Sequence, residues 1–407
     1  MSITASAEKI VIVGAGQAGG RAAESLRAAG FRGSITMIGA EKHAPYERPQ
    51  LSKQLLDEPD AQVAYLKAAE DWTSVLNVDL VTGATITACD AEKQIVAEAG
   101  GREFAFDQLL IATGTKPRRL HVFPDADARV HYLRSIEDAL RLRRYLHAKA
   151  RVVIIGGGVI GLEAASAAAK LGCQVTIVEG ADRLLARAFP RIVSEVVESK
   201  HRSHGVEFYF GVTVEAATSD SVQLTNGQLL QADVILVGVG VEPSNPIAHG
   251  FGLSSDMGIE VDAFGRTVIP NVYSAGDIAL QWSKWHNRRT RVETWANAQN
   301  QAICVAKNMI GEAREYADPP WFWSDQYDLN IQVVGDMLES DEVIRGNVQS
   351  GRFSVASLRE GEIVGAVSVN APKDMAMFRR LVANRTKLEK SDLESAAFDL
   401  RRALKSN

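Results

Sequence analysis

The sequence predicts an α/β protein that contains two Rossmann-like dinucleotide-binding domains and a C-terminal α+β domain. One observation is a unit that occurs twice, within residues 10–38 and 151–178: an apolar run, a glycine cluster, an Ala-rich helical pattern and a second apolar run. Another is the length of 407 residues, because one hydrophobic core rarely serves so long a chain. The third is a composition of 46% hydrophobic and 23% charged residues, which is typical of soluble globular proteins and not of disordered or fibrous ones.

Each unit is predicted to form a strand, a glycine turn, a helix and a second strand. Val- and Ile-rich runs bounded by glycine are typical of strands that are buried on both faces of a parallel sheet. The predicted segments of the first unit are 10–13, 14–19, a helix through Arg27, and 34–38. Those of the second unit are 151–155, 156–161, a helix through Leu171, and 174–178.

Both glycine clusters have the spacing GxGxxG between a strand and a helix. The glycines at these positions are Gly14, Gly16 and Gly19 in the first cluster and Gly156, Gly158 and Gly161 in the second. The spacing alone is weak evidence, but in this context the first glycine allows the turn, the second lets the backbone approach a pyrophosphate, and the third lets helix and strand pack closely. The helix N-terminus then offers free N–H groups and a positive dipole to the phosphates. Two such units predict two dinucleotides, FAD on the first and NAD(P)H on the second.

An acidic residue about 20 positions after the glycines binds the ribose hydroxyls in such domains. Glu179, at the end of the second unit, matches this position, and its carboxylate would accept hydrogen bonds from NADH and repel the 2′-phosphate of NADPH. We therefore predict NADH, although Arg183 nearby favours NADPH. In the first unit the acid is Glu41, one residue later than usual, with a solvated loop charge as the alternative interpretation.

The segments outside the two units complete the domains. A strand that ends in a Thr-Gly turn is predicted within 104–115 and a similar strand within 231–240, each as the last strand of a nucleotide domain. A further strand and turn at 271–277 precede a helix from near Thr294 to about Gly311. Alternating strands at 331–334, 353–357 and 363–369 with helical stretches predict an α+β module that begins near Trp321. The predicted domains are 1–117 (FAD, first part), 118–244 (NADH), 245–320 (FAD, second part) and 321–407 (C-terminal α+β interface domain).

Charge, hydropathy and cysteine usage exclude several classes of protein. A net charge of −5 argues against nucleic-acid binding by bulk charge. No apolar run approaches the ~18 residues that span a bilayer and no signal peptide precedes the first strand, so a cytoplasmic protein is expected. The three cysteines, Cys89, Cys173 and Cys304, are too far apart for a CxxC, zinc or iron–sulfur pattern and are expected to be buried apolar residues, with no metal bound.

Several unusual strings in the sequence resemble the NADH-dependent ferredoxin reductases of bacterial oxygenase systems. They are GAGQAGG, residues 45–53 (PYERPQLSK), ATG at 112–114, YLR at 132–134, GGGVIGLE ending at Glu163, SAGD ending at Asp277, VETWANAQNQA, and residues 321–326 (WFWSDQ). The resemblance runs along essentially the whole chain. It implies a fold like glutathione reductase, with an FAD domain split in sequence by an NADH domain.

The resemblance also implies roles for individual residues. Lys53, Glu163 and Trp323 would be the catalytic positions, with Lys53 beside the flavin and Trp323 at its exposed edge. The FAD site would comprise Gly14, Gly16, Ala18, Gly19, Glu41, Arg48, Lys53, Ile86, Thr113, Gly114, Arg134, Gly276, Asp277, Glu293, Trp295 and Ala296. The NADH site would comprise Gly156, Gly158, Val159, Ile160, Gly161, Glu179, Arg183, Gly238 and Gly240.

Within the FAD site, Ile86 is expected at the adenine end, Arg134 at the phosphates, Asp277 at the ribityl chain and Trp295 over the pyrimidine side of the flavin. Glu163 is expected to project from the first turn of its helix. The family commonly has Asp where this chain has Ala40 and Pro where it has Gln50, so the adenosine end of the site is expected to be held differently, with Glu41 in place of the missing Asp.

The resemblance implies transfer of hydride from NADH to FAD, and of single electrons from FAD to a 2Fe-2S ferredoxin that feeds a cytochrome P450 or Rieske-type oxygenase. A disulfide or peroxide reductase would need a reactive cysteine in 39–56, which contains none. A rubredoxin reductase differs only in its acceptor, and a flavoprotein of apoptosis-inducing-factor type would bind NADH with little turnover; both stay open. A monomer or weak homodimer is expected.

Ferredoxins of this kind are usually acidic around the cluster, so the docking surface is expected to carry arginines. Arg288 and Arg289 are the predicted docking residues, and Arg379 with Arg380 is the second candidate pair. The alternative is that both clusters are solvated faces, as charge runs usually are.

Overall fold

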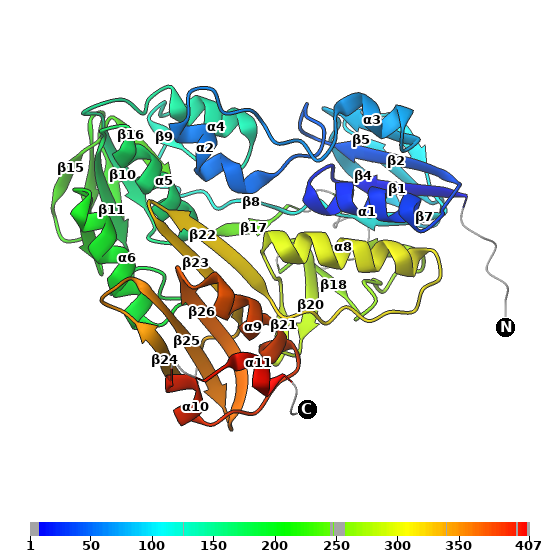
Figure 1. Cartoon of the computed structure of the whole chain (residues 1–407). Helices are drawn as coiled ribbons and strands as arrows, with labels where there is room; N and C mark the ends of the chain where they lie inside the picture. The colour runs from blue at the N-terminus through cyan, green and yellow to red at the C-terminus, as the bar shows by residue number, and fades with distance from the viewer. Residues whose placement is uncertain are drawn as a thin grey trace. The chain divides into compact units, whose positions relative to one another are not determined.

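The computed structural model describes residues 8–124, 126–244, 247, 257–338, 340–395 and 398–404 (Figure 1). The chain divides into two compact units. Unit 1 comprises Met1–Arg48, Val63–Lys116 and Val241–Pro320, and unit 2 comprises Pro49–Gln62, Pro117–Gly240 and Trp321–Asn407. The predicted start of the second FAD segment, residue 245, lies outside the described residues.

Unit 1 is built on a parallel sheet with the strand order β19-β7-β1-β2-β3. Its strands are β1 (Lys9–Val13), β2 (Ser34–Gly39), β3 (Val78–Thr82), β7 (Gln108–Ile111) and β19 (Val272–Ser274). Because successive side chains of a strand point to opposite faces, β1 serves two cores. Ile10 and Ile12 pack with α1 (Gln17–Ala28) and α8 (Trp295–Met309), whereas Val11 and Val13 pack with β4 (Ile86–Asp90) and β5 (Ile95–Glu98). The first strand, helix and strand agree with the predicted segments to within one residue or so.

The smaller elements of unit 1 surround this sheet. They are η1 (Arg48–Ser52, continuing into unit 2), α3 (Ala69–Ser74), β6 (Glu103–Ala105), β8 (Thr115–Pro117), β17 (Val241–Pro243), β18 (Ile259–Val261), β20 (Ala279–Ser283) and β21 (Arg288–Thr290). The strand predicted within 104–115 is divided into β6 and β7, whereas the predicted Thr-Gly turn at its end is present, before β8. Asp107 turns the chain by accepting the backbone N–H of Lys9 at 2.8 Å, and Gly114 turns it again with φ +68°.

Unit 2 repeats the architecture in a second parallel sheet, ordered β12-β11-β10-β16-β9. Its strands are β9 (Val130–His131), β10 (Arg151–Ile155), β11 (Gln174–Glu179), β12 (Glu207–Phe210) and β16 (Val234–Val237), with helices α2 (Gln54–Asp57), α4 (Ile136–Arg143), α5 (Val159–Lys170) and α6 (Arg191–Ser203). The strand predicted at 231–240 is shorter than expected. Asp233 ends the preceding segment by accepting hydrogen bonds from the backbone and side chain of Arg151, so β16 begins only at Val234.

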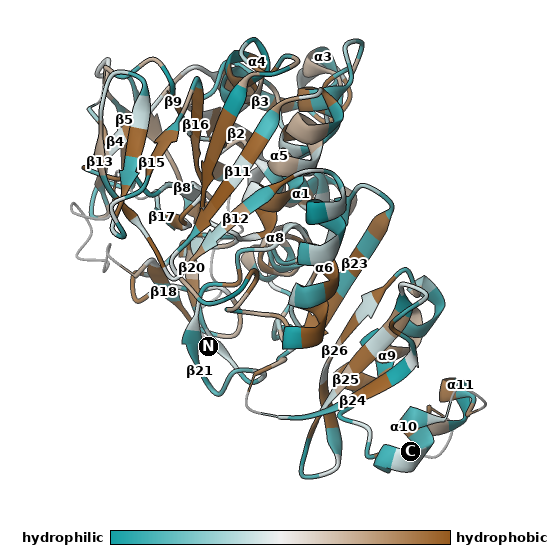
Figure 2. Ribbon diagram, turned by 90° about the vertical axis from the view of Figure 1, so that its left-hand side faces the viewer, coloured by the Kyte–Doolittle hydropathy of each residue, from teal (hydrophilic) through white to brown (hydrophobic). Residues whose placement is uncertain are grey.

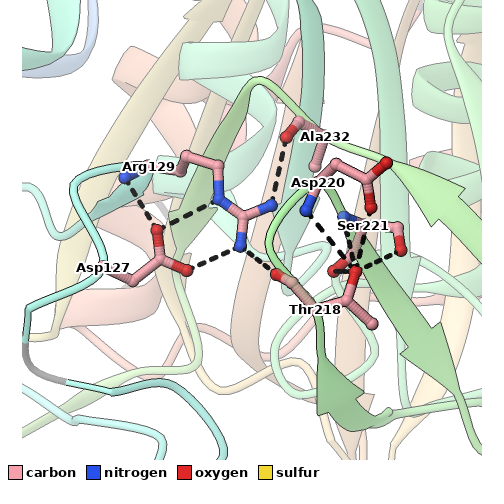
Figure 3. Close-up of polar contacts among 6 residues, drawn as sticks. All are labelled: Asp127, Arg129, Thr218, Asp220, Ser221 and Ala232. Carbon is pink, nitrogen blue, oxygen red and sulfur yellow. Dashed lines mark hydrogen bonds and ion pairs between the residues drawn. The ribbon is translucent and has the colours of Figure 1, made fainter.

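An antiparallel sheet of β13 (Val214–Ala217), β14 (Ser221–Leu224) and β15 (Leu229–Gln231) packs on one face of that sheet. Arg129 connects the two sheets, as Figure 3 shows. Its guanidinium donates to the carboxylate of Asp127 and to the backbone carbonyls of Thr218 and Ala232. The hydrogen bonds from Arg129 hold the pKa of the Asp127 carboxyl below its usual value. The half-buried cluster therefore fixes edge strand β9 against the turn before β14.

The C-terminal part of unit 2 is an antiparallel sheet ordered β22-β23-β26-β25-β24, covered by α9 (Pro372–Ala383) with α10 (Lys390–Glu394) and α11 (Leu400–Ala403). Its strands are β22 (Trp321–Gln326), β23 (Leu329–Gly335), β24 (Asp341–Asn347), β25 (Arg352–Arg359) and β26 (Glu362–Val369). Figure 2 shows hydrophobic and hydrophilic segments along these strands. Strands β23, β25 and β26 confirm the predicted ones, whereas the sequence had not predicted β22 and β24. Helix α5, which follows the second glycine loop, packs against β22 of the C-terminal sheet.

Candidate functional site

The first glycine loop lies between β1 and α1 in unit 1. Gly14 has φ +117°, and a Cβ there would lie 2.2 Å from the carbonyl oxygen of Ala112; a Cβ on Gly19 would lie 1.8 Å from the carbonyl oxygen of Gly14. These two positions therefore require glycine for close packing. At Gly16, by contrast, the nearest atom to a Cβ is the guanidinium of Arg48 at 3.7 Å. Gly16 is the N-cap of α1 and provides no side-chain cap, so the first N–H groups of the helix face this space.

The loops at the ends of β7 and β19 line the same region. Gly276, with φ +81°, lies so close to Ala18 that a Cβ would approach the alanine Cβ at 2.9 Å, and its N–H donates to Gln301 at 2.9 Å. The hydroxyl of Thr113 is buried and has no hydrogen-bond partner among the described residues. A turn of N–H donors, an open glycine and an unpaired buried hydroxyl fit the pyrophosphate of a dinucleotide.

Glu41 is not a solvated loop charge. Its carboxylate accepts a hydrogen bond from the Tyr46 hydroxyl at 2.6 Å and one from the Arg48 guanidinium at 2.5 Å. Burial alone would lower the pKa of Arg48, but Tyr46, Glu41 and Asp277 together raise it above its usual value. The Glu41 carboxylate therefore fixes Arg48 beside Gly16. Ile86, expected at the adenine end of the site, is a fully buried core residue at the start of β4.

Helix α8 begins as predicted, with the side chain of Thr294 capping the N–H of Asn297 at 3.1 Å. Trp295 donates through its indole N–H to Glu47. Asp277 follows the turn at Gly276, and its carbonyl accepts a hydrogen bond from Arg291, which also pairs with Glu293 at 2.9 Å. Unit 1 thus brings together the predicted FAD residues Ala18, Glu41, Arg48, Thr113, Gly276, Asp277, Glu293, Trp295 and Ala296.

The second glycine loop has the same geometry in unit 2. A Cβ on Gly156 (φ +109°) would lie 2.4 Å from the carbonyl oxygen of Gly238, and one on Gly161 would lie 2.3 Å from that of Gly156. Nothing lies within 4 Å of a Cβ on Gly158, and Ile160 beyond it is 47% exposed. The second loop therefore also combines two packing glycines with one open position at a helix N-terminus, between β10 and α5.

Glu179 lies at the end of β11, beside this loop. Its carboxylate accepts the backbone N–H groups of Gly157 at 2.6 Å and Ala181 at 2.7 Å. The guanidinium of Arg183 donates instead to the carbonyl of Phe189 and the hydroxyl of Ser194, at 2.9 and 2.7 Å. Arg183 therefore fixes the segment that follows β11, and the carboxylate is the charged group directed at the loop.

Lys53 and Glu163 form an ion pair in unit 2, with 3.5 Å between Nζ and Oε1. Glu163 is buried, with a side chain only 4% exposed, and burial raises the pKa of its carboxyl while Lys53 counteracts this. Helix α5 begins at Val159, so Glu163 is its fifth residue and lies just past the first helical turn in which it was predicted. The pair is held between α5 and the start of α2, for which Lys53 is the N-cap residue.

Hydroxyl groups complete the surroundings of the Glu163 carboxylate. Ser52 donates to Oε2 at 2.5 Å and Ser324 donates to Oε1 at 2.7 Å. Lys53 also contacts Asp325 at 2.9 Å and lies over the ring of Trp323, 5.5 Å from its centroid. The predicted catalytic residues Lys53, Glu163 and Trp323 therefore come together. Sequence reasoning missed Ser52 and Ser324, although both lie within strings that carry the family resemblance.

The predicted docking residues lie on the hairpin of β20 and β21 in unit 1. Arg288 and Arg289 are exposed, and Arg289 pairs with Glu260 at 3.4 Å. Trp282 is opposite Arg289 on β20 and is 61% exposed. In unit 2, Arg379 lies over the ring of Trp321, which stacks on Trp323. Arg134, also in unit 2, precedes α4, and its backbone N–H donates to Asp138.

Within the described residues, no helix combines the length and apolar character needed to cross a bilayer. The same part of the chain contains no group of three or more His, Cys, Asp or Glu side chains that could hold a metal ion.

Comparisons with known proteins agree with this geometry. Residues 8–302 match the family described as pyridine nucleotide-disulphide oxidoreductase, and residues 321–404 match the reductase C-terminal family. The chain is 42% identical over 395 residues to the ferredoxin–NAD(+) reductase component of the p-cumate 2,3-dioxygenase system of Pseudomonas putida, covering 97% of this chain and 98% of that protein. It is 39% identical to the corresponding component of the anthranilate 1,2-dioxygenase system of Burkholderia cepacia, covering 93% and 95%.

Among solved structures, the covalent complex of putidaredoxin reductase with putidaredoxin matches with a TM-score of 0.93 and 33% identity, covering 98% of each chain. The ferredoxin reductase for the CYP199A2 system of Rhodopseudomonas palustris matches with a TM-score of 0.92 and 34% identity, covering 97% of this chain and 99% of that one.

Proposed function

Because this chain belongs to the pyridine nucleotide-disulphide oxidoreductase family and has its reductase C-terminal domain, we propose that it is the ferredoxin reductase component of an oxygenase system. It would oxidise NADH through FAD and reduce a 2Fe-2S ferredoxin. The observation that carries the proposal is the pair of matching glycine loops, one in each unit, each with an open position at a helix N-terminus.

The family name suggests disulfide chemistry, but the environments of the three cysteines argue against it. Burial raises the pKa of the Cys89 thiol to about 12, and burial also raises the pKa of Cys173 and Cys304. Thiol nucleophiles react as thiolates, so all three are poorly suited to attack a disulfide. The segment 39–56, which follows the first dinucleotide unit, contains no cysteine.

When bound, FAD would accept hydride from NADH and release the two electrons singly to the ferredoxin. We assign the pyrophosphate of FAD to Gly14, Gly16 and the α1 N-terminus, and that of NADH to Gly156, Gly158 and the α5 N-terminus. Arg48 would balance phosphate charge, and Asp277 would accept from the ribityl hydroxyls. The N-terminus of α8 would place positive potential at the flavin pyrimidine, behind Trp295.

We assign Lys53 and Glu163 to the place where nicotinamide and flavin meet. The carboxylate of Glu163 keeps the ammonium group of Lys53 in one position, while Trp323 and Asp325 confine it from the side of β22. Excluding water from a charged pair strengthens its field on neighbouring groups. The residues of this chain would thus align the reactants and set the local potential.

The acceptor is tested by comparing NADH-dependent reduction of a 2Fe-2S ferredoxin, a rubredoxin and ferricyanide. We expect fast reduction of the ferredoxin and of ferricyanide. Preferential reduction of rubredoxin would identify a rubredoxin reductase, and slow reduction of every acceptor would identify a signalling flavoprotein instead.

NADH is expected to be preferred over NADPH by kcat/KM, because the Glu179 carboxylate faces the second loop. The variant Glu179→Gln, which replaces the carboxylate with a neutral amide, should narrow the preference for NADH over NADPH by about tenfold or more. A charged group that lacks its partner costs about 1 to 3 kcal/mol of binding free energy. Steady-state kinetics with both nucleotides measure this. Asp182→Asn, which removes a 69% exposed carboxylate nearby, is the matched control and should change nothing. A native preference for NADPH would refute the assignment of Glu179.

Ferredoxin is expected to dock at the β20–β21 hairpin, where Trp282 lies beside Arg288 and Arg289. Exposed tryptophan and arginine together are typical of binding hot spots. The double variant Arg288→Gln/Arg289→Gln should lower ferredoxin reduction about tenfold at low salt and flatten its salt dependence, because charge steering is screened over about 8 Å at physiological ionic strength.

Ferricyanide reduction by the same double variant should change little, and Arg102→Gln, at an exposed pair elsewhere in unit 1, should leave both activities unaltered. If both activities of the hairpin variant fall together, the arginines support cofactor binding. If neither falls, docking occurs elsewhere and Arg379 with Arg380 is the next pair to test.

A further inference from the structure

A chain of buried hydrogen bonds extends from Glu163 to the surface of unit 2. Ser324 donates to Glu163 at 2.7 Å, Gln326 contacts Ser324 at 3.0 Å, and the Gln326 carbonyl oxygen lies 2.9 Å from Nε2 of His201. The hydroxyl of Tyr327 lies 3.3 Å from Nδ1 of the same histidine. The four residues from Glu163 to His201 are at most 4% exposed, although they belong to α5, β22 and α6.

While Glu163 is ionised and His201 is neutral, only one arrangement of hydrogens satisfies every contact. The carboxylate can only accept, so the single proton of the Ser324 hydroxyl points at Glu163. The Ser324 oxygen must then accept from the amide nitrogen of Gln326, which leaves the amide oxygen facing His201. His201 must in turn carry its proton on Nε2.

The surroundings of His201 favour that tautomer. Burial lowers the pKa of His201 to about 4, so the ring is neutral at pH 7. Burial raises the pKa of the Tyr327 hydroxyl, so tyrosine keeps its proton and donates it to Nδ1. The ring of His204 stacks on that of Tyr327, with 3.8 Å between the ring centroids.

The chain of contacts cannot conduct protons, because a carboxamide does not readily pass a proton from its oxygen to its nitrogen. What it transmits is orientation: if the Gln326 amide were reversed, its oxygen would face Ser324 and draw the hydroxyl proton away from Glu163. The carboxylate would then lose one of the hydrogen bonds that stabilise its charge.

We propose that His201 is a positioning residue for Glu163. Its Nε2–H fixes the amide of Gln326, which aims the Ser324 hydroxyl at the carboxylate that faces Lys53. The link to catalysis rests on the proposed function, in which Glu163 and Lys53 lie where nicotinamide meets flavin. The charged groups that face Glu163 are Lys53 and, behind it, Asp325; the titratable groups near His201 are Tyr327, in contact with it, and His204, which lowers its pKa further.

Two variants separate positioning from packing. His201→Gln can place an amide N–H where Nε2–H lies, whereas His201→Phe fills similar volume without a donor. We expect His201→Phe to shift the acidic limb of the pH profile for NADH-dependent ferricyanide reduction upward by about one unit, because the carboxylate loses a hydrogen bond. His201→Gln should retain the native profile, as should the control His204→Gln.

The second readout needs no turnover. Nitrogen-15 NMR of histidine-labelled protein should show His201 as the Nε2–H tautomer at neutral pH. An Nδ1–H tautomer, or equal shifts of the pH limb in His201→Phe and His201→Gln, would overturn the proposal. No shift in His201→Phe would overturn it as well.

If His201→Phe does not fold, Gln326→Met interrupts the same contacts and is expected to give the same shift. Because ferricyanide is the electron acceptor in this test, its result does not depend on whether the natural acceptor is a ferredoxin. A protein that shows the predicted tautomer and pH shift but does not reduce ferredoxin would refute the proposed function alone.

Discussion

Gly14→Ala is expected to yield protein that has lost its yellow colour, with FAD content falling from about one per chain to about a tenth of that or less. The added Cβ would lie 2.2 Å from the carbonyl oxygen of Ala112, and the residue would have to keep φ +117°. Overpacking costs about 1 to 3 kcal/mol and the strained backbone about as much again, at the loop to which we assign the pyrophosphate. Flavin absorbance of the purified protein, measured with the flavin released on denaturation, gives the content.

Gly30→Ala is the matched control, because Gly30 also has a positive φ of 90° but nothing lies within 4 Å of an added Cβ. It should bind FAD fully with a small loss of stability. Gly16→Ala tests whether the open glycine makes room for the pyrophosphate. The added methyl group meets no protein atom closer than 3.7 Å, so a folded variant that has lost FAD would show that the methyl group collides with the cofactor. A yellow Gly14→Ala protein would contradict the assignment of the first loop.

Lys53→Met should slow reduction of the flavin by NADH by about a hundredfold or more. Removing one partner of a buried ion pair leaves the other charge uncompensated, which lowers the free energy of unfolding by about 3 to 5 kcal/mol. Glu163 would retain the hydroxyls of Ser52 and Ser324 but lose the ammonium group, and it would bind a proton more readily. Stopped-flow absorbance at saturating NADH measures the rate, and thermal unfolding reports the stability.

Lys170→Met provides the comparison for Lys53→Met. Lys170 lies on α5 and pairs with Asp57 of α2 at 3.0 Å. Because the Lys170 side chain is 51% exposed, the loss of stability and of reduction rate should be small. The double variant Lys53→Met/Glu163→Leu should recover stability without recovering the rate. If Lys53→Met reduces its flavin as fast as Lys170→Met does, the ion pair is structural only.

The parallel sheets could be predicted from sequence because their strands are buried on both faces and bounded by glycine. Where a segment was only partly apolar, the prediction failed for local reasons: Asp107 divides the strand predicted before the turn at Gly114, and Asp233 delays the start of β16. Strand β22 was missed because three aromatic residues are followed by three polar ones, WFWSDQ, so neither face of the strand is uniformly apolar.

The glycine loops and Glu179 follow from spacing, but the ion pair of Lys53 and Glu163 came only from the family resemblance. The two residues are 110 positions apart, and nothing local marks a loop lysine as buried. Ser324, on β22, is 161 positions from Glu163, and His201, on α6, reaches the pair only through Gln326 of the same strand. The contact of Ser324 with Glu163 exists only because α5 packs against β22, which no pattern in the sequence reveals.

Strand β22 has a consequence for how these enzymes could exchange parts in evolution. Ser324 of this strand donates a hydrogen bond to Glu163, and Asp325 at the next position accepts one from Lys53. A chain cut at residue 320 would therefore lose two side chains that contact the Lys53–Glu163 pair, together with its last domain. Recombination between relatives should succeed only when the incoming β22 has a hydroxyl residue and a carboxylate residue at the positions of Ser324 and Asp325. A shift of the strand by one residue would place the wrong side chain beside Glu163 and Lys53.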